Sequence, residues 1–205
     1  MGAASLKIAS ANVLNYFNVT GVTSGSRQVM FTTPLGNQQG IRGANNAQEL
    51  ERPRAKIVAS LVGLDADIYG LMEVQNNGSG DASALKDLTD ALNASTDKPT
   101  GARYDYVKAP FKEGSAEVLG AGTDAITVAI VYRSDRVQPA GMAAVASPAT
   151  YSAFNGSVGG SRVPVAQTFS VQMGGGVADQ VTVVVNHFKS KGSVLPGAGK
   201  TDQGD

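Results

Sequence analysis

The sequence contains no cysteine, no tryptophan and one histidine among 205 residues. The absence of cysteine excludes disulfides, thiol catalysis and cysteine-based metal sites, but leaves the compartment open because secreted bacterial proteins also manage without it. There is no net charge, since 17 basic residues balance 17 acidic ones, so binding to a polyanion would require a local patch. No apolar run approaches the roughly 18 residues that a membrane span needs. Residues 1–4 show no signal-peptide features, and we interpret them as an engineered start on an excised domain.

Periodic apolar residues predict two helices, and β-branched runs predict strands. The order is strand, helix, strand, helix and then a run of strands, which predicts an α/β layered domain with a mixed sheet. We expect Asp81 or Ser83 to cap the second helix, and residues 134–136 to form a hairpin-like turn. Residues 15–50 look like a long polar loop up to the start of the first helix. The predicted strands cover residues 6–14, 66–74, 104–108, 125–133, 137–145, 165–173 and 181–188, and the predicted helices cover residues 46–64 and 81–94.

The single histidine, His187, follows the β-branched run 181–185. Lys189 and Lys191 come directly after it. A strand that brings an imidazole and two ammonium groups to one sheet edge predicts an anion-binding site. A solvated basic turn at a strand end is the alternative, and the segment alone does not decide between them.

Other polar side chains also stand at the ends of predicted strands. Glu73 closes an apolar strand, where a carboxylate is costly unless it is solvated, paired or bound to a cation. With the amide of Asn12 nearby, it would suit a Mg²⁺ ion that keeps several waters, although an exposed strand-end glutamate is the alternative. Arg162 and Asp124 each precede a strand. Because strand ends gather at one edge of a layered sheet, we expect these groups to lie together and to favour phosphoryl chemistry.

Seven segments in this order are similar to the endonuclease/exonuclease/phosphatase superfamily, and specifically to its bacterial extracellular nuclease branch. The long loop with RGAN favours that branch over apurinic endonucleases and inositol phosphatases. The segments are SANVLNYF (10–17), RGAN (42–45), ERPRAKIV (51–58), LDADIYGLMEVQNNG (64–78), AIVYRSDRV (129–137), RVPVAQTF (162–169) and VVVNHFKSKGS (183–193).

This resemblance implies a four-layer α/β/β/α sandwich that cleaves phosphodiester bonds of DNA with Mg²⁺, leaving Mn²⁺, Ca²⁺ and RNA open. It also implies a role for each motif residue. Glu73 would bind the metal, Asn12 would lie beside the metal or phosphate, His187 would donate to the scissile phosphate or its leaving oxygen, Arg162 would contact phosphate, Asp124 would support a catalytic histidine, and Lys189 and Lys191 would hold the substrate backbone.

The family's Gly-Asp-x-Asn and Ser-Asp-His motifs have no counterpart in the sequence. We therefore expect residues 1–205 to form a single incomplete domain, with little or no nuclease activity unless a complementary C-terminal part is present. The branch also implies an extracellular or cell-surface location. Two alternatives stay open: a phosphodiesterase or phosphatase of phospholipids or sugar phosphates in the same superfamily, and a non-catalytic module that binds nucleic acid.

Overall fold

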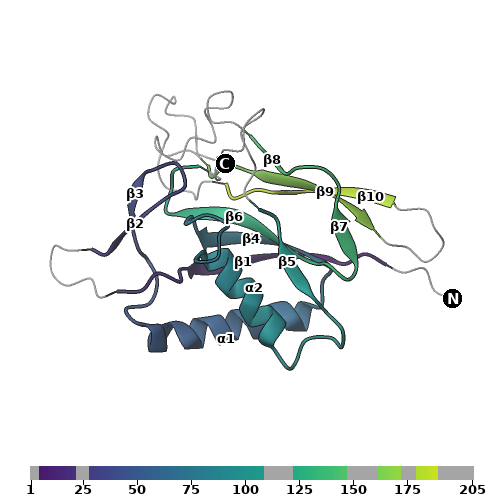
Figure 1. Ribbon diagram of the computed structural model, residues 1–205, viewed down its shortest axis with the longest axis horizontal. Helices are drawn as coiled ribbons and strands as arrows, with labels where there is room; N and C mark the ends of the chain where they lie inside the picture. The colour runs from purple at the N-terminus through teal and green to yellow at the C-terminus, as the bar shows by residue number, and fades with distance from the viewer. Residues whose placement is uncertain (1–4, 22–27, 109–121, 147–160, 172–178, 189–205) are drawn as a thin grey trace, which may run out of the picture.

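Two β-sheets pack face to face, and two helices cover the outer face of the first sheet (Figure 1). The computed structural model describes residues 5–21, 28–108, 122–146, 161–171 and 179–188. The first sheet has the order β1-β4-β6-β5, the second has β10-β9-β7 with β8 beside β9, and β2 and β3 form a separate hairpin. The elements are β1 Ile8–Tyr16, β2 Met30–Thr32, β3 Gln38–Gly40, α1 Ala47–Leu64, β4 Ile68–Gln75, α2 Ala84–Ala94, β5 Tyr104–Tyr106, β6 Ile126–Arg133, β7 Val137–Pro139, β8 Ala144–Val145, β9 Val165–Val171 and β10 Asp179–Val185.

The predicted fold class, an α/β domain with mixed and largely antiparallel sheets, is confirmed. Among the described strands, β1 and β4 run parallel and every other pair is antiparallel. Within the same ranges both helices lie on the first sheet, so helices, first sheet and second sheet form three successive layers (Figure 1). The fourth layer that the resemblance implies is not found among these residues.

Both helices form where the sequence predicts them, and side-chain caps define their starts. The Asn46 side chain accepts a hydrogen bond from the backbone N–H of Glu49 at the start of α1. Ser83, one of the two predicted caps, accepts from the N–H of Lys86 at the start of α2. Such caps satisfy N–H groups that have no partner inside the helix. The apolar faces of both helices pack on the first sheet around Tyr69, Leu88 and Leu92.

The space between the sheets is filled by a second apolar cluster. The Phe169 ring from β9 packs against the Tyr132 ring from β6, with ring centroids 5.2 Å apart. Gly70 on β4 allows the sheets to approach, because a Cβ atom there would stand 2.9 Å from Cγ2 of Val185 on β10. This close approach holds the end of β10, and the residues that follow it, over the first sheet.

Three sequence predictions differ from the structure. Residues 134–136 do form a turn, in which the N–H of Arg136 donates to the carbonyl of Arg133, but it is not a hairpin turn. It carries the chain from β6 in the first sheet to β7 in the second. The predicted strand 137–145 is divided into β7 and β8 around Gly141, which has a φ of 80°. The predicted loop 15–50 contains the β2–β3 hairpin, whose three-residue strands are too short to show a periodic pattern.

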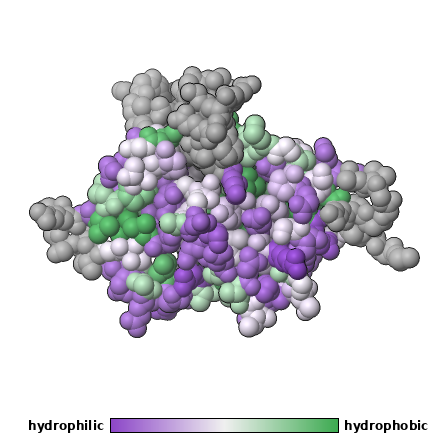
Figure 2. Space-filling view, viewed as in Figure 1, coloured by the Kyte–Doolittle hydropathy of each residue, from purple (hydrophilic) through white to green (hydrophobic). Residues whose placement is uncertain are grey.

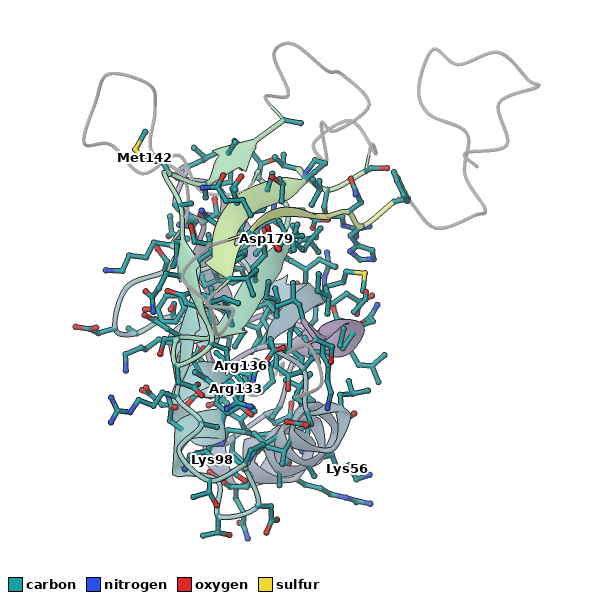
Figure 3. All side chains as sticks on the ribbon, turned by 90° about the vertical axis from the view of Figure 1, so that its right-hand side faces the viewer. Lys56, Lys98, Arg133, Arg136, Met142 and Asp179 are labelled. Carbon is teal, nitrogen blue, oxygen red and sulfur yellow. The ribbon has the colours of Figure 1, made fainter. Side chains whose placement is uncertain are left out.

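At the other end of β4, ion pairs join the two sheets. Asp67 is buried, accepts the backbone N–H of Lys7 at 2.9 Å and pairs with Arg136 at 3.2 Å. Arg133 pairs with Asp135 at 2.6 Å (Arg133 and Arg136 are labelled in Figure 3). These charges stabilise the turn that joins the sheets.

On the side of the molecule seen in Figure 2, the surface over the helices is mainly hydrophilic. Within the described ranges, neither helix has the length and apolar character required to cross a membrane.

Candidate functional site

The site lies where β1 and β4 both depart from regular strand geometry. The register of this parallel pair shifts between Asn12 and Tyr16, and the register of β4 with β6 shifts around Glu73. Leu14, Asn15 and Glu73 have φ values of 53°, 55° and 67°. A non-glycine residue in the left-handed region costs of the order of 1–3 kcal/mol, and such residues cluster at functional sites. These irregularities turn the side chain of Glu73 toward β1.

The Glu73 carboxylate is held by β1 through both of its oxygens. Oε1 accepts a hydrogen bond of 2.9 Å from Nδ2 of Asn12, and Oε2 accepts one of 3.0 Å from the backbone N–H of Asn15. The amide oxygen of Asn12 in turn accepts the N–H of Leu14 at 2.8 Å. We call this group, Asn12, Leu14, Asn15 and Glu73, the β1–β4 clamp. It fixes the position of one carboxylate with strained backbone on both sides.

His187 approaches the clamp from the second sheet. Its Nε2 lies 3.7 Å from Oε1 of Glu73, and its side chain is 16% exposed. Burial lowers its pKa, and the charge of Arg162 lowers it further, while Glu73 and Asp124 act in the opposite direction. The neutral imidazole is therefore favoured. Within the described part of the chain, its buried Nδ1 has no hydrogen-bond partner.

Arg162 and Asp124 form the side of the site next to His187. The backbone N–H of Arg162 donates to the carbonyl of His187 at 3.2 Å, which ties the start of β9 to the end of β10. The Arg162 side chain pairs with Asp124 at 2.9 Å, and Arg42 pairs with the other oxygen of that carboxylate at 3.3 Å. Asp124 therefore holds two guanidinium groups in place. The resemblance implies that Asp124 supports a catalytic histidine other than His187. The sequence contains no such residue, because His187 is its single histidine.

Five of the predicted site residues thus form one continuous group of contacts. It runs from Asn12 to Glu73, His187, Arg162 and Asp124, although these residues come from segments far apart in the chain. Lys189 and Lys191 lie outside the described residues. The catalytic and binding roles given to all seven residues stay predictions.

Three further residues belong to the site and were not among the predicted ones. Arg42 lies in the RGAN segment, which was used for the resemblance but not for the site. Asn76 is buried, and its side-chain amide donates to the carbonyls of Gly122 and Asp124, both at 2.9 Å. Gln75 is also buried and accepts the backbone N–H groups of residues 18 and 19. The sequence alone does not distinguish these amides from those of an exposed polar turn, and only their burial shows that they position loops.

The donor set fits a weakly held hard cation. Within the described ranges, no three histidine, cysteine, aspartate or glutamate side chains gather closely enough to hold a metal. Each Glu73 oxygen accepts one hydrogen bond and retains further lone-pair capacity. A single carboxylate suits Mg²⁺ that keeps most of its waters and takes its remaining ligands from a substrate phosphate. The Asn12 oxygen is already used by Leu14, so Glu73 would be the main protein ligand.

No protein-family model and no curated protein matches the chain. Four solved chains match, including the crystal structure of an endonuclease/exonuclease/phosphatase family protein from Bacteroides thetaiotaomicron. That match is 18% identical, has a TM-score of 0.45 and covers 89% of this chain. The chain spans 50% of the length of that protein. The description of that protein names the superfamily that the motifs resemble; for this chain, the superfamily and its extracellular nuclease branch stay predictions.

Proposed function

We propose that this chain carries one side of a metal-dependent phosphodiester hydrolase site that acts on nucleic acid. The observation that supports it best is the convergence of a fixed carboxylate, an imidazole and two guanidinium groups, supplied by both packed sheets and by the segment after β3. A site for phosphoryl transfer needs such positive groups close to a cation-binding carboxylate, because catalysis depends on stabilising charge on the phosphoryl oxygens. The proposed activity also agrees with the resemblance of the sequence motifs to the endonuclease/exonuclease/phosphatase superfamily.

Each side chain has a role that its contacts allow. Arg162 and Arg42 would neutralise the phosphate, and Asp124 would keep both guanidinium groups at the site. The neutral His187 can hydrogen-bond to a phosphate or leaving oxygen through Nε2 once substrate separates it from Glu73. Glu73 would hold the Mg²⁺ ion, which when bound polarises a phosphoryl oxygen.

The strained backbone of the β1–β4 clamp supports this proposal over a module that only binds nucleic acid. Binding to phosphates needs exposed Lys and Arg, and it does not require a carboxylate held in one orientation. Glu73 itself and the two β1 residues beside its carboxylate, Leu14 and Asn15, have positive φ, which costs stability that a simple binding surface would not need. Lys189 and Lys191 would add contacts to the substrate backbone, and an extracellular location is proposed on the resemblance alone.

The proposal is tested by metal binding and plasmid nicking on the same samples. We expect Mn²⁺, followed by electron paramagnetic resonance, to bind the wild-type chain and to bind Glu73→Gln at least about tenfold more weakly. Asp90→Asn, which removes an exposed carboxylate on α2, is the matched control and should bind like the wild type. Nicking of supercoiled DNA should be slow, metal-dependent and absent in Glu73→Gln and His187→Ala.

Equal Mn²⁺ binding by all three proteins, together with no metal-dependent nicking, would refute the proposal. Fast turnover that His187→Ala abolishes would support the hydrolase but contradict the expected incomplete site. DNA retention that falls with salt, without metal binding at Glu73, would instead favour the non-catalytic module.

A further inference from the structure

Leu14 is placed where a leucine is unfavourable in two respects. Its side chain is 81% exposed, the highest value among the exposed large apolar side chains of the described residues. Its backbone has a φ of 53°, a conformation in which glycine or asparagine is normally found. The hydrogen bond from its N–H to Asn12 holds it in this conformation within the β1–β4 clamp. Neither core packing nor backbone preference therefore explains a leucine here.

A hollow of about 270 Å³ opens beside Leu14. Its lining includes the apolar residues Val13, Leu50 and Pro53 together with Glu49, Asn15 and Arg42. Asn15 donates its backbone N–H to Glu73, and Arg42 pairs with Asp124, so the hollow adjoins the proposed phosphate position at two points. The first turn of α1 is already capped by Asn46, so it offers no anion site here.

The size and chemistry of the hollow match one nucleobase. Its volume is slightly below the 300–1,000 Å³ typical of sites for larger ligands, so it would hold one base and not two stacked bases. Leu14 offers an apolar surface to a ring face, and the guanidinium of Arg42 can lie against an aromatic ring. A paired base would have both faces and one edge occupied within the duplex.

We infer that Leu14, Arg42 and this hollow form a subsite for an unpaired base next to the phosphate at His187. The inference rests on the proposed function and extends it, because it makes single-stranded or locally unpaired nucleic acid the preferred substrate.

The test measures stability and binding of the same variants. Leu14→Gly removes the apolar contact and relieves the left-handed strain, so its urea unfolding midpoint should be unchanged or raised. Its affinity for a short fluorescein-labelled single-stranded oligodeoxynucleotide, from anisotropy at low salt with EDTA, should fall about five- to tenfold. Leu14→Met should bind like the wild type. Met142→Gly removes another highly exposed side chain, 73% exposed between β7 and β8, and should leave binding unchanged.

An abasic oligonucleotide of the same length separates base contacts from phosphate contacts. Wild type and Leu14→Gly should bind the abasic oligonucleotide with equal affinity, because it keeps the phosphates and lacks the base that Leu14 would contact. If the wild type binds both oligonucleotides equally, or if Leu14→Gly weakens both to the same extent, the subsite is overturned while nucleic-acid binding stands. If Leu14→Gly instead reduces retention on phosphatidylcholine vesicles and leaves oligonucleotide binding unchanged, the occupant is a lipid and the inference is wrong. If no variant binds either oligonucleotide in a salt-dependent way, the nucleic-acid part of the proposed function fails as well.

Discussion

Phe169 offers the most direct test of how the second sheet is held over the first. Its side chain is fully buried, and its ring packs on Tyr132 across the space between the sheets. Replacing a buried phenylalanine by alanine removes its transfer free energy and leaves a cavity, together about 3–5 kcal/mol. About 0.5–1.5 kcal/mol of such a loss is typical of the aromatic pair itself. Since domains are stable by about 5–15 kcal/mol, Phe169→Ala should remove a large part of the free energy of unfolding.

Equilibrium unfolding in urea, followed by circular dichroism and by tyrosine fluorescence, measures this loss. Tyrosine is a clean probe because the chain has six tyrosines and no tryptophan. With a typical dependence of about 2 kcal/mol per molar urea, the midpoint should fall by roughly 2 M. Val184→Ala is the matched control, because Val184 lies on the outer face of the same sheet and is 52% exposed. A cost below about 1 kcal/mol for Phe169→Ala, similar to that of the control, would show that Phe169 does not hold the sheets together.

Three other predictions concern stability. Ser83→Ala removes the cap of α2 and should lower the free energy of unfolding by about 1 kcal/mol in the same urea assay, whereas no change would mean that the cap contributes nothing. Gly70→Ala should lower the free energy of unfolding by about 1–3 kcal/mol, because the new Cβ would meet Val185. Adding Val185→Ala should recover part of this loss. If the double variant instead loses the sum of the two single costs, the steric argument is contradicted. Burial raises the pKa of Tyr132 to about 12, and burial, with Asp87 as its hydrogen-bond partner, also raises that of Tyr16. Both tyrosines contribute fully to the free energy of unfolding below their unfolded pKa of about 10. This contribution should be lost as the pH rises through their folded pKa values. A free energy of unfolding that stays constant from pH 9 to about 12 would contradict the prediction.

The two helices and most strands were predictable because their signals are local. The stripe of apolar residues in α1 and the cap at Ser83 depend on neighbours within a few positions, and the structure has both. The turn at 134–136 shows where local signals fail. A short turn between two strands looks the same whether the strands pair or enter different sheets, and buried contacts such as that of Phe169 with Tyr132 decide between the two.

The sequence could predict that several polar residues lie together at the candidate site, but not the geometry in which they meet. Polar groups at strand ends identified Glu73 and His187, since both follow apolar runs in which a polar residue is unusual. The register shift that turns Glu73 toward β1 depends on the pairing of three strands, and no pattern in one segment shows it. Asn76 was missed for a similar reason, because the sequence does not show whether an asparagine is buried or exposed.

The position of β10 at the edge of its sheet has a consequence for how the candidate site would come apart on heating. Among the described strands, β10 is hydrogen-bonded to β9 alone, and His187 follows directly after it. Edge strands can detach in local openings that need much less free energy than global unfolding. Amide protons of β10 should therefore exchange with solvent earlier than those of β4, which has neighbours on both sides. The arrangement of His187 over Glu73 would then be lost at temperatures at which most of the protein is still folded.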